Sequence, residues 1–394
     1  MKKILLIIID GLGDEPIPRL KNKTPLEAAK TPNLDFLAKN GICGQVLPYF
    51  ERGENPTSEE THLALFGYGP RKFNPGRGVL EVLGLKEKIL PGDLCLRGNF
   101  TTVNKDLKII DRRAGRIEKT QNLILALEKI KIRGVRIIIK KGLSHRLGII
   151  FRGKNFSENI SSNDSKKAGV KVLKIFPKDN SKKAKFTAKI LNEFVEKSHL
   201  ILKNYPFNKN RKLPANYLLL RGAGKFKRVK SFFQKFKLKS ACIAGAPLYK
   251  GIGKYLGMDL IEIKGANGLP NTNLRGKIFS ARQALGKYEF IFLHIKAADN
   301  LAEDGKFFEK MKFIEKIDKN LKPILNLKNS LIVVTGDHST CSLLKRHCKR
   351  PLPILIYGNG KDGVLKFSEK NCRKGKLKIK QIGLMKKTLE LAKS

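Results

Sequence analysis

Residues 331–340 read LIVVTGDHST, in which four apolar residues predict a buried strand that leads into the adjacent pair Asp337 and His338. Two other stretches share this arrangement: residues 4–9 (ILLIII) run into Asp10, and residues 290–295 (FIFLHI) are followed by Asp299. Strands that are apolar throughout are typical of a parallel sheet covered on both faces. Ligands of such sheets bind beyond the carboxyl ends of the strands, so these polar residues are expected to share a site.

Helical patterns between the strands complete an α/β fold. Thr24-Pro25 and Thr31-Pro32 each place proline at the first position of a helix, and residues 307–321 carry apolar side chains at helical spacing. Further strands are predicted at residues 217–220, 240–244, 260–263 and 354–357. Strands that alternate with helices predict a mainly parallel sheet with helices on both faces.

The length and the local patterns divide the chain into two domains. At 394 residues the chain is long enough for a core that carries a large insertion. Residues 85–195 contain shorter, alternating strands, such as 135–139 and 148–151, mixed with loops. We therefore predict a larger domain from residues 1–84 and 196–394, and a smaller inserted α/β domain from residues 85–195.

The chain is strongly basic, with 81 Lys and Arg against 34 Asp and Glu and a net charge of +47. Clustered basic residues neutralise phosphates, so nucleic-acid binding is one interpretation. The basic runs lack interleaved aromatic residues and match no nucleic-acid-binding motif, which favours a solvated, lysine-rich surface instead. The positive field would still attract a small phosphorylated anion.

Six cysteines are scattered along the chain without a CxxC pair, at positions 43, 95, 242, 341, 348 and 372. This spacing predicts neither a disulfide framework nor a zinc ribbon, so we expect mostly buried, reduced thiols in a reducing compartment. No apolar stretch approaches the roughly 18 residues that cross a bilayer, and residues 4–9 lack the cleavage site of a signal peptide. The sequence predicts a cytoplasmic protein with no membrane contact.

Residues 56–62 read PTSEETH and precede the apolar residues 63–66, which is the pattern of a helix N-terminus. Ser58 is either a cap of this helix or a nucleophile. Backbone N–H groups at a helix N-terminus stabilise an anion, and a metal ion would lower the pKa of the serine hydroxyl further. Carboxylate and imidazole ligands after the three strands suit Mn²⁺ or Zn²⁺. His62 is left open between a contact of Ser58 and a core or surface position, and His294 has no assigned role.

Together these motifs resemble the archaeal-type, cofactor-independent phosphoglycerate mutases, a branch of the alkaline phosphatase superfamily. The matching segments are residues 9–11, 24–29, 56–62, 65–68, 97–100, 111–116, 144–146, 216–224, 247–251, 294–299 and 335–340. The resemblance implies an alkaline-phosphatase-like α/β core with a mainly parallel sheet, and a substrate-binding role for residues 85–195. It further implies that the chain interconverts 3-phosphoglycerate and 2-phosphoglycerate through a phosphoserine intermediate, a step of glycolysis and gluconeogenesis.

The resemblance also implies two divalent metal ions, with Mn²⁺ preferred and Mg²⁺, Co²⁺ or Zn²⁺ as alternatives. One ion would be held by Asp10, Ser58, Asp337 and His338, and the other by Asp299, Glu303 and His347. Glu303 stands where the family has a histidine, and a carboxylate favours harder ions such as Mn²⁺ or Mg²⁺ over Zn²⁺. This departure keeps an alternative open, a related phosphotransferase or phosphohydrolase acting on another small substrate such as homoserine.

A substrate that carries a carboxylate and a phosphate requires basic side chains, which the resemblance places in the inserted domain. The implied substrate contacts are Arg97, Asn99, Asp111, Arg112, Arg113, Arg116, His145 and Arg146. Arginine binds carboxylate and phosphate groups through two parallel hydrogen bonds. Lys250 is implied to act catalytically by steadying the transferring phosphoryl group. A small phosphorylated carboxylate is thus the expected partner, no specific nucleic acid is expected, and the oligomeric state is left open.

Overall fold

The computed structural model describes residues 1–50 and 57–393, which form two compact units. Unit 1 comprises residues 1–74 and 229–394, and unit 2 comprises residues 75–228. Pro56, in the segment around Ser58, lies outside the described residues.

The inserted domain is longer at both ends than the predicted residues 85–195. Helix α5 (Arg77–Gly84) and strand β7 (Tyr217–Gly224) both belong to unit 2. β7 pairs antiparallel with β3 (Leu94–Val103), from Thr101 opposite Tyr217 to Cys95 opposite Gly224. This ladder of backbone hydrogen bonds ties residues 217–224 to unit 2, so assigning them to the larger domain was wrong.

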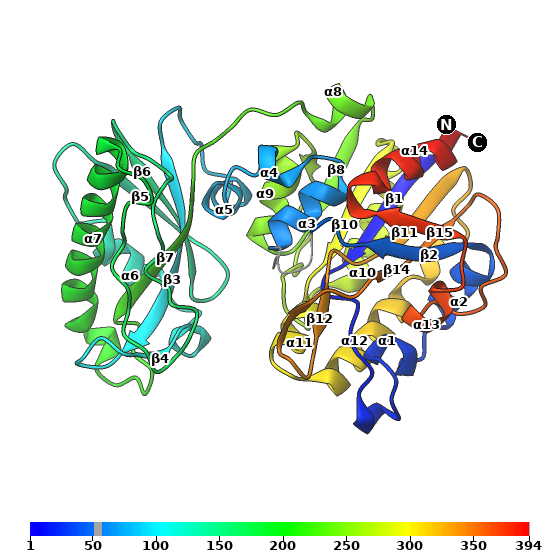
Figure 1. Cartoon of the computed structure of the whole chain (residues 1–394), viewed down its shortest axis with the longest axis horizontal. Coiled ribbons are helices and arrows are strands. Elements are labelled where there is room, and N and C mark those ends of the chain that lie inside the picture. The colour runs from blue at the N-terminus through cyan, green and yellow to red at the C-terminus, as the bar shows by residue number, and fades with distance from the viewer. Residues whose placement is uncertain (51–56, 394) are drawn as a thin grey trace. The chain divides into compact units, whose positions relative to one another are not determined.

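Among the described residues, the main sheet of unit 1 has eight strands in the order β15-β2-β14-β11-β1-β10-β8-β9 (Figure 1). Their bounds are β1 Lys3–Ile9, β2 Gly41–Leu47, β8 Ser240–Ile243, β9 Asp259–Leu260, β10 Phe290–Ile295, β11 Ser330–Thr335, β14 Leu352–Tyr357 and β15 Leu377–Lys380. β14 runs antiparallel to both of its neighbours, and the other pairs are parallel. The predicted α/β class with a mainly parallel sheet is confirmed.

Helices cover both faces of this sheet (Figure 1). The helices described in unit 1 are α1 Pro25–Ala28, α2 Pro32–Lys39, α3 Ser58–Leu65, α4 Pro70–Phe73, α8 Phe232–Phe236, α9 Pro247–Tyr255, α10 Leu274–Ala284, α11 Ala297–Glu303, α12 Phe307–Asn320, α13 Glu369–Cys372 and α14 Leu384–Lys393. Leu5, Ile7 and Ile9 of β1 share one core with apolar residues of α2, α10 and α12. The alternate residues of β1 are equally buried, as expected for a central strand with helices on both sides.

Unit 2 is built on an antiparallel sheet in which β3 pairs with β4, β6 and β7, and β6 pairs with β5. The remaining elements are β4 Ile109–Asp111, β5 Arg136–Lys141, β6 Arg146–Arg152, α6 Gln121–Leu127 and α7 Lys182–Lys203. Leu191 and Phe194 of α7 belong to the same hydrophobic core as Leu96 and Phe100 of β3. Unit 2 therefore has a hydrophobic core of its own on one face of its sheet.

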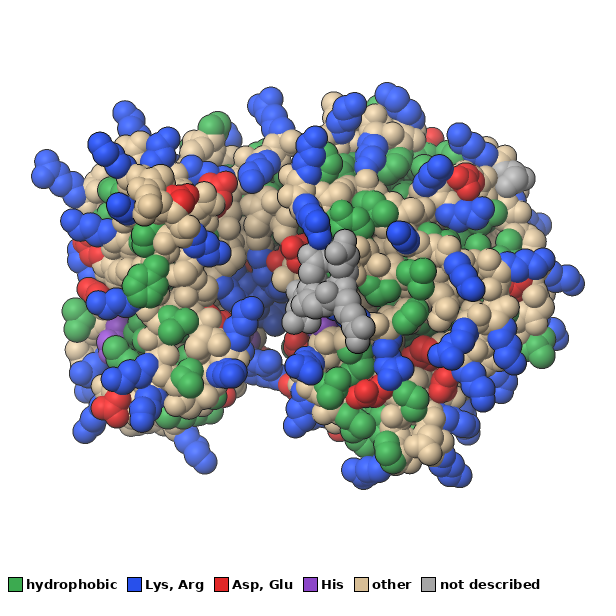
Figure 2. Space-filling view, viewed as in Figure 1, with side chains coloured by type: hydrophobic (Ala, Val, Ile, Leu, Met, Phe, Trp, Pro, Cys, Tyr) green, Lys and Arg blue, Asp and Glu red, His purple; other side chains and the backbone are tan. Residues whose placement is uncertain are grey.

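The surface agrees with a solvated, basic chain. On the face shown in Figure 2, Lys and Arg side chains are scattered among neutral ones over both units. Of the helices in the described part of the chain, none is both long and apolar enough to cross a membrane.

Candidate metal centre and anion-binding face

The polar residues that follow three strands meet at one edge of the unit 1 sheet. β1 lies between β10 and β11, so the carboxyl end of β1 places Asp10 between the segments that carry Asp299 and Asp337. Asp299 lies in the first turn of α11, directly after β10, and His338 follows Asp337. All four side chains are buried.

Two sets of side chains hold their donor atoms within 4.8 Å of one another: Asp10 with Asp337 and His338, and Asp299 with His338 and His347. His338 belongs to both sets, and its ring stacks on that of His347 with the centroids 3.7 Å apart. His347 Nε2 lies 3.6 Å from Asp299 Oδ1. Carboxylate oxygens mixed with imidazole nitrogens are a donor set that fits a divalent ion such as Mn²⁺ or Zn²⁺.

A glycine permits the close approach of these segments. Gly11 has a φ of +66°, and a Cβ on it would lie 2.7 Å from Asp299 Cα and 2.8 Å from Thr340 Oγ1. Its backbone N–H donates to Asp337 Oδ1 over 3.1 Å. Any side chain at this position would therefore collide with Asp299 and Thr340.

Ser58 is the first residue of α3, and the cap position belongs to Thr57. The backbone N–H and the hydroxyl of Thr57 both donate to the Glu60 carboxylate over 2.8 Å. The interpretation of Ser58 as a cap is therefore wrong. Its hydroxyl lies instead in the buried site, with Oγ 3.4 Å from His338 Nε2.

Lys296 neutralises part of the negative charge. Its ammonium group contacts the Asp299 carboxylate and lies 3.3 Å from Asp10. Burial alone raises the pKa of Asp10, but Lys296 and the neighbouring histidines outweigh it and hold the pKa well below its usual value. They do the same at Asp299, where the pKa falls to about 2. Burial and the charge of Asp10 instead raise the pKa of Asp337.

Two buried histidines each contact one of the carboxylates. His294 Nε2 lies 3.1 Å from Asp10 Oδ2, and its ring stacks on Tyr249 with the centroids 3.5 Å apart. His62 Nδ1 lies 2.7 Å from the Ser58 carbonyl oxygen and 3.5 Å from Asp337 Oδ2. Burial lowers the pKa of His62 to about 4 and that of His294 to about 3, so both rings are neutral near pH 7. His62 is thus a core residue that contacts the Ser58 backbone, and His294 acquires a role that its sequence position did not suggest.

Two predicted residues are not drawn into these donor sets. Glu303 is the last residue of α11, and it belongs to neither set found among the described residues. Lys250, on α9, forms an ion pair with Glu262 over 2.5 Å. Metal binding by Glu303 and phosphoryl contact by Lys250 stay predictions.

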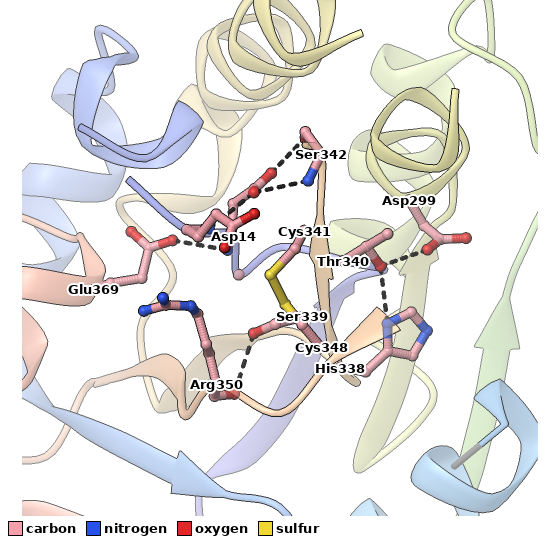
Figure 3. The surroundings of a disulfide bond; sticks show 12 residues. Asp14, Asp299, His338, Ser339, Thr340, Cys341, Ser342, Cys348, Arg350 and Glu369 are labelled. Carbon is pink, nitrogen blue, oxygen red and sulfur yellow. Dashed lines mark hydrogen bonds between the residues drawn. A yellow bond between two sulfur atoms is a disulfide. The ribbon is translucent and has the colours of Figure 1, made fainter. Parts of the chain in front are cut away.

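A hairpin carries the last histidine ligand candidate. β12 (Ser339–Cys341) pairs antiparallel with β13 (Arg346–Cys348), with Thr340 opposite His347. A disulfide joins Cys341 to Cys348 across this hairpin, with the Cα atoms 5.8 Å apart (Figure 3). The expectation of reduced thiols is wrong for this pair, because the hairpin brings the two cysteines together. The other four cysteines are buried and free.

In unit 2, basic side chains gather on one face of the sheet. Arg97 and Asn99 are two residues apart on β3 and so lie on the same face; Arg221 of β7 is opposite Arg97, and Arg146 of β6 is opposite Asn99. Arg97 is only 2% exposed, lies 3.3 Å from Glu81, and has a pKa lowered by burial and by the surrounding arginines. Arg97 Nε, Arg221 Nε and Asn99 Oδ1 are buried with no hydrogen-bond partner among the described residues. The two guanidinium N–H groups are buried donors that fit an oxyanion, whereas the Asn99 oxygen is an acceptor.

Other predicted substrate residues have structural partners. The Asp111 carboxylate accepts from the backbone N–H groups of Arg113 and Gly115 over 2.6 and 3.1 Å, which supports a turn. Arg112 forms two hydrogen bonds with Asp164, over 2.7 and 3.1 Å. Arg116 ends the short 3-10 helix after this turn.

His145, next to Arg146, is buried, and its pKa falls to about 2 because of burial and the nearby arginines. Arg221 was not among the predicted contacts, although its segment, residues 216–224, was one of the motifs that carried the resemblance. Its position opposite Arg97 appears only once β7 is paired with β3.

Comparison with known proteins places this geometry in a family. The model of the metalloenzyme superfamily matches residues 2–391. The chain is 42% identical to 2,3-bisphosphoglycerate-independent phosphoglycerate mutase 1 of Archaeoglobus fulgidus, over 98% of this chain and 97% of that protein. It is 43% identical to the corresponding mutase of Methanococcus aeolicus, over 95% and 94% of the two chains.

Solved structures agree with these sequence matches. The cofactor-independent phosphoglycerate mutase of Thermoplasma acidophilum is 36% identical and covers 100% of both chains with a TM-score of 0.68. A protein of Pyrococcus horikoshii is 32% identical and covers 100% of this chain and 97% of its own, with a TM-score of 0.84. The chain belongs to the metalloenzyme superfamily and, within it, to the family of 2,3-bisphosphoglycerate-independent phosphoglycerate mutases.

Proposed function

We propose that this chain interconverts 3-phosphoglycerate and 2-phosphoglycerate by passing the phosphoryl group through Ser58. The observation that carries the proposal is the position of Ser58 Oγ, 3.4 Å from Nε2 of His338, the histidine shared by both donor sets. A hydroxyl beside a cluster of metal-binding side chains, at the start of a helix, is placed to become a nucleophile.

The donor sets fit two divalent ions, for which we propose Mn²⁺. Asp10, Ser58, Asp337 and His338 would hold one ion, and Asp299 and His347, with Glu303, the other. When bound, the ions would lower the pKa of the Ser58 hydroxyl and neutralise charge on the phosphoryl oxygens. Asp10 and Asp299 share one lysine, Lys296, and Asp337 adds a third carboxyl group beside them, which supports a site built for cations.

The transfer proceeds in two displacements. Ser58 Oγ loses its proton and attacks phosphorus, the bond from phosphorus to O3 of 3-phosphoglycerate breaks, and the released alkoxide takes up a proton. The 2-hydroxyl of the retained glycerate then loses its proton and attacks phosphoserine, and the serine oxygen leaves and is reprotonated. Backbone N–H groups at the start of α3 stabilise the negative charge on the serine oxygen in both steps.

The basic face of unit 2 has the side chains that an anionic substrate requires. Arg97, Asn99, Arg146 and Arg221 lie on one face of its sheet, where buried guanidinium N–H groups fit a carboxylate or a phosphate. We propose that these four side chains bind the anionic groups of the substrate. A reaction on a small, hydrophilic phosphorylated acid suits a cytoplasmic enzyme of glycolysis or gluconeogenesis.

The proposal is tested with purified protein, Mn²⁺ and 3-phosphoglycerate, without added 2,3-bisphosphoglycerate. We expect the protein to form 2-phosphoglycerate. A metal chelator should stop this formation, and the Ser58→Ala variant should form none. Phosphohomoserine and other phosphorylated alcohols are tested in the same assay. Turnover of one of them in place of 3-phosphoglycerate would favour a related phosphotransferase or phosphohydrolase. Absence of conversion with Mn²⁺, Mg²⁺, Co²⁺ and Zn²⁺, or an active Ser58→Ala variant, would contradict the proposal.

A further inference from the structure

Thr340 joins the two donor sets through a single hydroxyl group. It is the middle residue of β12, its side chain is fully buried, and it belongs to the segment 335–340, in which the sequence analysis gave it no role. Its Oγ1 lies 2.6 Å from Asp299 Oδ1 and 3.1 Å from His338 Nδ1 (Figure 3). It therefore touches Asp299, which belongs to one set, and His338, which both sets share.

The number of available protons decides which atom donates in each of these two hydrogen bonds. A threonine hydroxyl has one proton, and an ionised carboxylate can only accept, so Thr340 donates to Asp299. Thr340 Oγ1 can then only accept from His338, which requires a proton on Nδ1. A histidine that binds a metal is neutral and carries one N–H, so Nε2 of His338 is left with its lone pair.

The bare nitrogen points at a cluster of electron-pair donors. His338 Nε2 lies 3.1 Å from Asp337 Oδ2, 3.5 Å from Asp10 Oδ1 and 3.4 Å from Ser58 Oγ. Carboxylate oxygens and an unprotonated nitrogen repel one another unless a cation or a proton lies between them. The tautomer set by Thr340 is thus the one that a metal ion at this point requires.

The backbone of Thr340 is held on both sides. Its N–H donates to the Gly13 carbonyl over 2.9 Å, and its carbonyl accepts from the fully buried Lys310 ammonium over 3.1 Å. The next two residues are also fixed, because Cys341 is bonded to Cys348 and the Ser342 hydroxyl donates to Asp14 over 2.6 Å (Figure 3). A hydroxyl on so constrained a backbone can hold the geometry of its partners.

We infer that Thr340 is a positioning residue of the metal centre: its hydroxyl sets the tautomer of His338 and the orientation of Asp299 at once, and so couples the two donor sets. The inference rests on the metal centre of the proposed function. It assigns to Thr340 no contact with substrate.

The test compares Thr340→Val, which keeps the shape but loses the hydroxyl, with Thr340→Ser, which keeps the hydroxyl. We expect Thr340→Val to weaken Mn²⁺ binding to the metal-free protein, measured by calorimetry, by roughly 10- to 100-fold, and Thr340→Ser to stay within a few-fold of wild type. Thr335→Val is the matched control, since the buried Thr335 hydroxyl donates to the Pro353 carbonyl over 2.9 Å, outside the donor sets. It should leave Mn²⁺ affinity unchanged.

A second readout needs no variant to fold and no substrate. Nitrogen-15 NMR of the histidine rings at neutral pH should show His338 of the wild-type protein protonated at Nδ1. Wild-type Mn²⁺ affinity in folded Thr340→Val, or an Nε2-protonated His338, would overturn the inference. Because neither measurement involves phosphoglycerate, a negative mutase assay would overturn the proposed function and leave this inference to be judged by its own results.

Discussion

Reduction of the Cys341–Cys348 disulfide should destabilise the hairpin that carries His347. The two cysteines are seven residues apart, and the described ladder between β12 and β13 contains only three residue pairs. The loss of chain entropy on closing a loop of this length corresponds to about 2.5 kcal/mol at 25 °C. The loop between the two strands carries the half-exposed Leu343 and Leu344. These side chains have little contact with the core that could hold the loop in place after reduction. We therefore expect the free energy of unfolding of the reduced protein to be lower by about 2.5 kcal/mol.

The assay is urea unfolding of the metal-free protein, followed by circular dichroism, before and after treatment with a phosphine reductant. Cys341→Ala/Cys348→Ala is the control and should be as stable as the reduced wild type and insensitive to the reductant. A change below about 0.5 kcal/mol, within the error of the extrapolation, would refute the reasoning. A reductant effect that persists in the double variant would also refute it, because the structure leaves Cys43, Cys95, Cys242 and Cys372 as free thiols.

Three further predictions concern charged and titratable groups. As the pH falls through 6.5, His145 becomes protonated in the unfolded chain but not in the folded protein, where its pKa is about 2. The free energy of unfolding should therefore fall by about 2 kcal/mol by pH 5. Urea unfolding at pH 7 and pH 5 should show a smaller loss of stability for His145→Asn than for wild type, and equal losses would contradict the assignment. Lys296→Met removes the ammonium group that pairs with Asp10 and Asp299 and that would compete with a metal ion for them. The rise in melting temperature on adding Mn²⁺ should therefore be larger than in wild type. An unchanged rise would show that Lys296 does not compete with the metal. Arg97→Lys removes the guanidinium group that we propose binds an anionic group of the substrate through two hydrogen bonds. The KM for 3-phosphoglycerate in steady-state assays should rise about tenfold or more, and an unchanged KM would remove Arg97 from the substrate site.

The sequence predicted most strands of the main sheet and the cluster at its edge, but not β2 or β15. Asp10, Asp299 and Asp337 each follow an apolar strand, and β1, β10 and β11 are neighbours, so the rule for strand ends brought them together. The strands at 217–220 and 354–357 were also predicted, but not their partners. An apolar strand has the same pattern in either sheet, which is why β7 was assigned to the wrong domain and the antiparallel direction of β14 was missed.

The parts of the site that the sequence did not predict depend on contacts that only the folded structure shows. Thr340 and Lys296 are ordinary residues in the sequence, and their roles follow from distances to Asp299 and Asp10. The pairing of Cys341 with Cys348 depends on a hairpin too short to give a strand pattern. The spacing of three residues between Lys296 and Asp299, one turn of a helix, was a usable signal.

The most direct test of the central claim is the site of phosphorylation during turnover. Wild-type protein is mixed with Mn²⁺ and 3-phosphoglycerate, quenched in acid within the turnover time, digested and mapped by mass spectrometry. We expect a phosphoryl group on Ser58, absent from Ser58→Ala and from wild type quenched without substrate. A protein that converts 3-phosphoglycerate to 2-phosphoglycerate while Ser58 stays unmodified and another residue carries the phosphoryl group would contradict it.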